Sequence, residues 1–103
     1  GAGARPVASL LARRDAASGN PRTTNARHES IWLDPEMAVL LPALDGTSDH
    51  AGLAALLVAA AADGRIALPD GITPEDGNAL EAAMSGQVPV WLGGLAEMGL
   101  LEP

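Results

Sequence analysis

Residues 34–49, DPEMAVLLPALDGTSD, contain one complete helix with its start and stop signals, followed by the start of a second helix. Asp34 can accept hydrogen bonds from free backbone amides, and Pro35 loses nothing at the first helical position. The apolar residues that follow recur at the spacing of one helix face: Met37, Leu40, Leu41 and Leu44. Pro42 removes a backbone donor, so we expect a kink or a tight last turn before the helix closes at Asp45 and Gly46.

The sequence before this stretch predicts a helix, a polar segment and a short strand. Pro6 suits the first position of a helix over about residues 6–17. Its predicted face holds Val7, Leu10, Leu11 and Arg14. Turn-forming residues end this helix at 18–21, and a polar segment follows. Residues 30–33 then alternate as a short edge strand does, with Trp32 on the outer face.

The sequence after this stretch predicts a second helix and a second strand. Residues 47–49 open the helix, which runs to about residue 62. Its predicted inner face holds Leu53, Leu56, Leu57 and Ala60. Residues 65–68 alternate in polarity, so they could form a short strand that pairs with residues 30–33.

The last quarter of the chain predicts two further helices. Thr73 and Pro74 supply the cap and first position of one of them. Its predicted inner face holds Ala79, Leu80, Ala83 and Met84. We expect a break near Ser85 and Gly86, because Pro89 restricts the residues before it. The final helix would carry one apolar stripe: Trp91, Leu92, Leu95 and Met98.

Composition limits both the fold and the chemistry. A chain of 103 residues has room for one hydrophobic core, and much of its apolar content is alanine. The sequence holds no Cys, Tyr, Phe or Lys. This excludes disulfides, thiolate chemistry, Schiff-base chemistry and most aromatic stacking platforms. We expect a single α+β domain, mostly helical, with two or three short strands.

The charge is strongly uneven along the chain. Residues 1–34 hold five arginines and three acidic residues, whereas residues 35–103 hold one arginine and ten acidic residues. The net charge of −7 disfavours nucleic acid and anionic lipid as partners. No stretch is long and apolar enough to cross a membrane, and the start lacks a signal-peptide pattern. We therefore expect a cytoplasmic protein with neither a nucleic-acid nor a membrane partner.

Few residues are candidates for chemistry. The acidic residues fall mainly at predicted helix starts, and His28 and His50 lack a second ligand at helical spacing, so we expect no catalytic, cofactor-binding or metal-binding residue. Polar side chains cluster only in residues 23–28. Arg27 could clamp a carboxylate and Asn25 could bond a peptide backbone, which makes Asn25, Arg27 and His28 the candidate partner-binding residues. Alternatively, this loop only leads into the strand or docks on a neighbouring domain.

The two tryptophans are interpreted differently. Trp91 lies on an apolar stripe, which is typical of a core position. Trp32 lies on the outer face of the predicted edge strand, where an exposed ring would be an interaction anchor.

Three motifs together carry a family resemblance: RPVASLLAR at residues 5–13, TNARHE at 24–29 and LLPALDGT at 40–47. The set resembles the C-terminal winged-helix region of bacterial S-adenosylmethionine-dependent methyltransferases that carry a regulatory domain, a group that includes protein-lysine methyltransferases. The match is densest up to Gly64. The tail, with its glycines and Pro89, departs from the long final helix that the family leads us to expect.

The resemblance implies a winged-helix-like domain at residues 29–103, which follows the N-terminal linker and helix arm expected at 1–28. It implies a non-catalytic accessory or regulatory domain that shapes the substrate cleft or packs against the enzyme. Its partners would be the catalytic methyltransferase domain of the same polypeptide, which would bind S-adenosylmethionine, and a protein substrate. The acidic surface would suit a lysine-bearing substrate, because opposite charges raise encounter rates.

A second interpretation stays open. Residues 40–47 and the following helix are also similar to small winged-helix modules that bind the leader peptides of ribosomally made natural products. In such modules an extended peptide adds to a sheet edge, which here would be the strand at 30–33. A DNA-binding winged helix is disfavoured by the negative charge.

Overall fold

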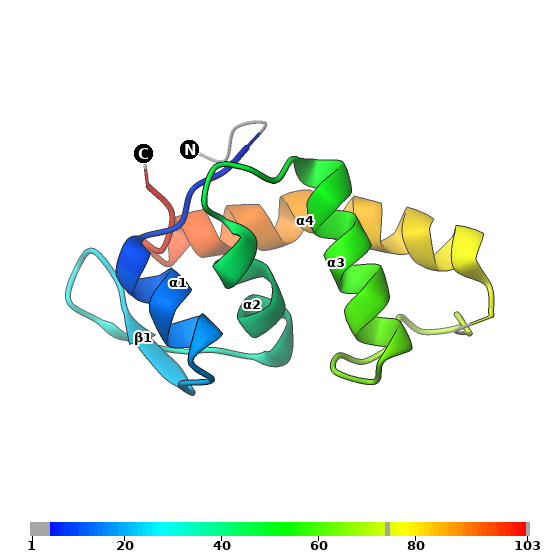
Figure 1. Cartoon of the computed structure of the whole chain (residues 1–103), viewed down its shortest axis with the longest axis horizontal. Helices are drawn as coiled ribbons and strands as arrows, with labels where there is room; N and C mark the ends of the chain where they lie inside the picture. The colour runs from blue at the N-terminus through cyan, green and yellow to red at the C-terminus, as the bar shows by residue number, and fades with distance from the viewer. Residues whose placement is uncertain (1–4, 74, 103) are drawn as a thin grey trace.

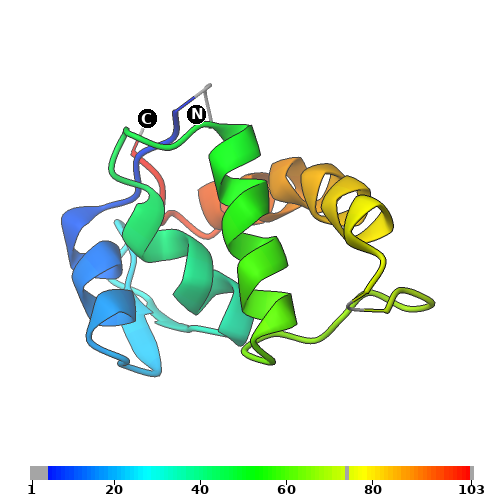
Figure 2. The ribbon, with the colours of Figure 1, turned by 45° about the vertical axis from the view of Figure 1, so that its right-hand side comes forward.

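The longest element of the computed structural model is α4 (Gly77–Glu97), which runs along the molecule (Figure 1). The structure describes residues 5–73 and 75–102. Before α4 come α1 (Leu10–Ala17), β1 (Arg22–Thr24), β2 (Ser30–Trp32), α2 (Pro35–Leu40), the 3-10 turn η1 (Leu41–Ala43) and α3 (His50–Ala62). Helix α2 lies between α1 and α3, and α3 packs on α4 (Figure 2).

Every α-helix begins at a side chain that accepts a hydrogen bond from a backbone amide three residues on. Asp34 accepts from Met37 N at 3.0 Å and Asp49 from Gly52 N at 2.8 Å. Such a cap contributes about 1 kcal/mol, because it satisfies an amide that the helix leaves free. The predicted starts of α2 and α3 are therefore confirmed. The predicted tight turn at Pro42 is also confirmed, because η1 closes α2 as one 3-10 turn.

The first helix starts later than predicted and buries a different face. Ser9 caps it, with Oγ accepting from Ala12 N at 3.2 Å, so residues 6–9 are not helical. Val7 and Ala8 instead form isolated bridges with Asp45 and Leu101. Leu10 and Leu11, which helical spacing placed on one face of the predicted helix, are each 50% exposed. The core instead receives three alanines, Ala12 and Ala16 from α1 and Ala8 from the segment before it.

The hairpin pairs differently from the prediction. The strand predicted at residues 30–33 is confirmed as β2, but its antiparallel partner is β1, with Thr23 opposite Ile31. Residues 65–68 form no strand. The amide of Arg65 bonds to the carbonyl of Ala60 at 2.8 Å in the C-terminal cap of α3, so it is not available to a β ladder.

Helix α4 passes through the position where a break was predicted. It is continuous over 21 residues and holds Pro89 in its interior. It begins at Gly77 with Asp76 as cap, and not at Thr73. Pro89 is exposed, while one buried row on the other face holds both halves of the helix against the core: Leu80, Met84, Val88, Leu92 and Leu95. The packing of this row offsets the backbone bond that proline removes.

One core joins all the helices. Its buried leucines come mainly from α3 and α4, with one each from α2 and η1, and the alanines of α1 belong to the same cluster. The proposed division between an arm at 1–28 and a domain at 29–103 stays a prediction about domain organisation. Within the described residues, the helix of that arm shares its core with the rest of the chain.

Candidate functional site

Asn25 is the first residue of the turn that joins β1 to β2, and it is 5% exposed. Its amide nitrogen donates to the carbonyl of Met98 at 2.6 Å and to Glu29 Oε1 at 2.8 Å. Its amide oxygen accepts from the backbone amides of Arg27 at 3.0 Å and Glu29 at 2.8 Å. Asn25 therefore fastens the hairpin turn to the end of α4.

Arg27 extends this tie at the surface. Its Nε donates to Glu29 Oε1 at 2.7 Å and its Nη2 to the carbonyl of Glu97 at 3.1 Å. The Asn25 hydrogen bond and then the Arg27 guanidinium hold the pKa of Glu29 below its usual range. Both charged side chains are more than half exposed, so the pair contributes little to stability.

The structure thus brings Asn25 and Arg27 together around Glu29. His28 is exposed at the turn, with a φ of 61°. That these three residues contact a partner stays a prediction. Glu29 was not among the residues predicted from the sequence, although it lies two residues from Arg27 and four from Asn25, which places it within reach once the chain turns.

Trp32 is the most exposed aromatic side chain of the described residues. It is 69% exposed on β2, and the Arg22 guanidinium lies 5.0 Å from the centre of its ring. The two residues are opposite each other in the hairpin register. Trp32, which the sequence places on the outer face of the strand, is thus exposed, and its role as an anchor stays a prediction. Trp91 is only partly buried, packed against the core rather than within it.

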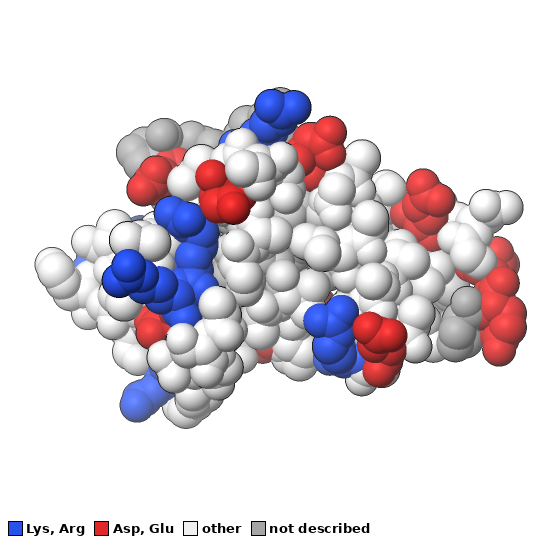
Figure 3. All heavy atoms as spheres, viewed as in Figure 1, with Lys and Arg blue, Asp and Glu red and all other residues white. Residues whose placement is uncertain are grey.

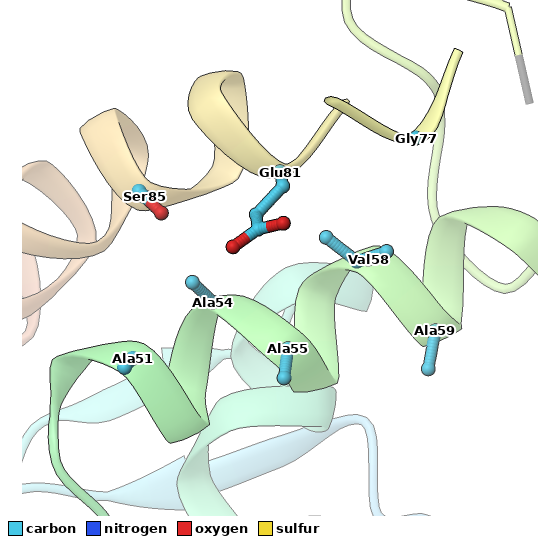
Figure 4. A pocket seen from close by; sticks show the side chains of 8 residues that line it. All are labelled: Ala51, Ala54, Ala55, Val58, Ala59, Gly77, Glu81 and Ser85. Atoms are coloured by element: carbon cyan, nitrogen blue, oxygen red, sulfur yellow. The ribbon is translucent and has the colours of Figure 1, made fainter. Parts of the chain in front are cut away.

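A groove runs between α3 and α4 (Figure 4). Its volume is about 360 Å³, within the usual range of ligand pockets. Its walls are Ala51, Ala54, Ala55, Val58 and Ala59 from α3 and Gly77, Glu81 and Ser85 from α4. The Glu81 side chain points from α4 toward α3. This groove was not predicted from the sequence. Two signals were present: alanines at four-residue spacing on α3, and Glu81 with Ser85 at the same spacing on α4.

Charge separates along the molecule (Figure 3). Basic side chains gather over α1 and the hairpin, whereas acidic ones mark the end where α4 begins. The chain leading into α4 carries Asp70, Glu75 and Asp76. Among residues 5–73 and 75–102, no three His, Asp or Glu side chains are grouped as metal ligands would be. None of the described helices is both long and apolar enough to span a bilayer.

The comparison with protein families agrees with this architecture. The family described as "PKMT, C-terminal winged helix domain" matches residues 4–100. The chain belongs to this family of protein-lysine methyltransferase domains. No curated protein and no solved structure gives a significant match. The resemblance seen in the sequence is confirmed, and so is the mostly helical α+β winged-helix fold, here with one two-stranded hairpin in the described part.

Within this winged-helix domain, the chemistry-bearing side chains divide into two groups. Asn25, Arg27, Glu29 and the capping aspartates are engaged in holding the fold. Trp32 at one end and Glu81 in the groove face solvent and are the best placed to meet a partner.

Proposed function

We propose that this winged-helix domain is a non-catalytic accessory part of a protein-lysine methyltransferase. Its hairpin end docks on the catalytic domain of the same polypeptide, and its acidic end faces the protein substrate. The catalytic domain binds S-adenosylmethionine and transfers the methyl group. The accessory domain forms one side of the substrate cleft.

The observation that carries the proposal is the rigid presentation of Trp32. The hairpin that bears it is tied to the end of α4 by Asn25, yet the indole is 69% exposed. Aromatic residues on a fixed framework dominate binding energy at interfaces, since they bury a large area and lose little entropy. Arg22, stacked on the ring, adds a cation at the same place.

The use of the polar groups supports a non-catalytic role. Asp34, Asp49 and Asp76 each accept a backbone amide at a helix start. Nucleotide-like cofactors are usually held where a glycine-rich turn joins a strand to a helix. The connection from β2 to α2 is Leu33 followed by Asp34, with no glycine.

The charge distribution supports the assignment of the two ends. A lysine-bearing protein is attracted to the acidic end where α4 begins, and long-range attraction raises the rate of encounter. Salt screens such attraction. Affinity for a basic protein substrate should therefore fall as ionic strength rises, and an affinity that does not depend on salt would remove this part of the proposal.

The docking role is tested by Trp32→Ala in the polypeptide that carries both domains. We expect a several-fold rise in KM for the protein substrate, or a fall in kcat, with unchanged affinity for S-adenosylmethionine. Val90→Ala is the matched control, because Val90 is a similarly exposed apolar residue on α4. Unchanged kinetics for Trp32→Ala contradict the docking role.

The non-catalytic role is tested on the 103-residue chain itself. Titration calorimetry with S-adenosylmethionine should give no binding heat. Tight binding of S-adenosylmethionine, or methyl transfer by this chain alone, contradicts the proposal.

Peptide binding at the free edge of β2 is a second candidate function. In the described residues β2 pairs only with β1, so its other edge can accept an extended peptide. The strand is three residues long, which limits the backbone hydrogen bonds that an added strand can form. Saturable binding of leader-type peptides to the chain, lost when Ser30→Pro removes a backbone amide from the free edge of β2, would favour this function over the accessory role.

A further inference from the structure

We infer that the groove between α3 and α4 receives an unmodified lysine side chain from a basic segment of the protein substrate. This inference rests on the proposed function and names the part of the substrate that the domain recognises. The juxtaposition that carries it is an apolar trough of small side chains on α3 facing the Glu81 carboxylate on α4.

The trough suits the hydrocarbon stem of lysine. Its α3 wall consists of four alanines and Val58, so it is smooth and apolar. Lysine buries its methylene chain along such surfaces while its charged end stays in a polar environment. At one end Gly77 leaves open space, because a Cβ there would meet no atom within 4 Å. This opening gives the peptide backbone room to pass.

Glu81 and Ser85 suit the ammonium group. They lie one turn apart on the same face of α4, and both line the groove. Among the hydrogen bonds and ion pairs of the described residues, none engages the Glu81 carboxylate. An ammonium carries three donors, and a carboxylate with a hydroxyl supplies acceptors for two of them. A hydrogen bond to a charged acceptor is about twice as strong as a neutral one.

The surrounding charge favours a cation at this place. Asp70, Glu75 and Asp76 precede the first turn of α4 and come before Glu81 in the sequence. Arg65, which follows α3, is paired with Asp63 at 3.5 Å. Both members of that pair are exposed, and their opposite charges cancel. The pair therefore leaves the negative potential of the end where α4 begins largely intact.

The lining chemistry also predicts selectivity for the unmethylated amine. Quaternary ammonium groups are recognised by aromatic cages, and none of the eight lining residues is aromatic. Trimethylation removes every donor that Glu81 and Ser85 could use. The groove therefore distinguishes the substrate of methyl transfer from its fully methylated product.

The test is an NMR titration of the ¹⁵N-labelled chain with three short peptides that differ at one central position: lysine, trimethyl-lysine or norleucine. The lysine peptide should shift the amide signals of Ala55, Glu81 and Ser85. The other two peptides should bind at least about threefold more weakly. Equal binding of the trimethylated peptide, or shifts confined to other surfaces, overturns the inference.

Two pairs of variants locate the binding. Glu81→Gln should weaken the lysine peptide about threefold to fivefold, the size of one exposed ion pair. Glu97→Gln is the matched control, because it removes the same charge from an exposed position on α4 outside the groove. Ala55→Leu should fill the trough and weaken binding, whereas Ala62→Leu, exposed on α3 and outside the lining, should not. Equal losses within either pair overturn the inference.

The outcome is distinguishable from that of the proposed function. The Trp32→Ala kinetics report on docking at the hairpin end, and they do not depend on the groove. If lysine fails to bind while Trp32→Ala still raises KM, the accessory role stands and this inference fails. If the signals of the groove shift with protein concentration alone, its occupant is a second copy of the chain, which also contradicts the inference.

Discussion

Removing the side chain of Asn25 should destabilise the domain more than its position in a hairpin turn indicates. Asn25→Ala deletes all four hydrogen bonds at once, including the one to the carbonyl of Met98, 73 residues away in sequence. Asn25→Asp is the sharper variant. It keeps the shape and both accepting positions, but it loses the two donors and sets a carboxylate beside Glu29.

The magnitude follows from burial. A hydrogen bond contributes about 0.5–1.5 kcal/mol net, and losing one partner costs more when the other stays buried. Asn25 is 5% exposed, but part of the surrounding turn can regain bonds to water. We expect Asn25→Ala to lower the free energy of unfolding by about 2–4 kcal/mol. For a domain of this size that lowers Tm by roughly 8 °C or more. Asn25→Asp should cost at least about 2 kcal/mol at pH 7.

Urea denaturation followed by circular dichroism measures both changes, provided that the transitions stay two-state. Asn20→Ala is the control, because Asn20 donates one exposed hydrogen bond to Asp15 at 2.8 Å. It should cost less than about 0.5 kcal/mol. If Asn25→Ala falls within about 0.5 kcal/mol of the unsubstituted chain, the tie is not structural, and a partner-binding role for this residue gains support.

Three further predictions test neighbouring features. The pKa of Glu29 is lowered in the folded chain, so the ionised carboxylate stabilises the fold. This contribution to the free energy of unfolding is present above the usual titration range of Glu29 and is lost as pH falls through the lowered pKa. Glu29→Gln should therefore have a lower Tm than the unsubstituted chain at pH 7, and the gap should narrow as pH falls through the lowered pKa of Glu29; a gap that does not change with pH contradicts the assignment. Gly99→Ala should lower the free energy of unfolding more than Gly19→Ala. Both glycines have a positive φ, but only a Cβ at position 99 would meet the Arg27 side chain, at 3.2 Å. Equal losses of unfolding free energy would contradict this crowding. Pro89→Ala should raise the free energy of unfolding by about 1–3 kcal/mol, since it restores a helical hydrogen bond. A fall in stability would show that the proline stabilises α4 at this position.

Local signals in the sequence were sufficient for much of the helical framework. Asp34 and Asp49 were recognisable as caps because capping depends on residues within one turn. The leucines of α3 were largely placed correctly for the same reason, since Leu53 and Leu57 follow the helical period and are fully buried. The turn at Pro42 also needed only local chemistry.

The errors lie where tertiary packing outweighs local preference. Pro89 favours a break by its own chemistry, but the buried row on the opposite face of α4 holds the helix together. The start of α1 depends on bridges from Val7 and Ala8 to residues far along the chain. The choice of β1 as partner for β2 depends on Asn25, whose bond to Met98 joins the turn to the far end of the sequence. None of these contacts has a signature within a short window.

Tertiary contacts also explain why the sequence showed the polar cluster that holds Asn25 and Arg27 but did not show that both residues hold the fold together. A cluster of polar side chains is visible in the sequence, but whether those groups are free depends on partners elsewhere in the fold. Asn25 meets Met98 and Arg27 meets Glu97, so both donate to carbonyls at the end of α4. A residue engaged in this way can contact a partner only by giving up a bond or by using what remains exposed. Trp32 and Glu81 carry no such cost, because the ring and the carboxylate already face solvent. Interaction chemistry in this winged-helix domain is therefore expected at its two ends, rather than in the polar motif that first draws attention.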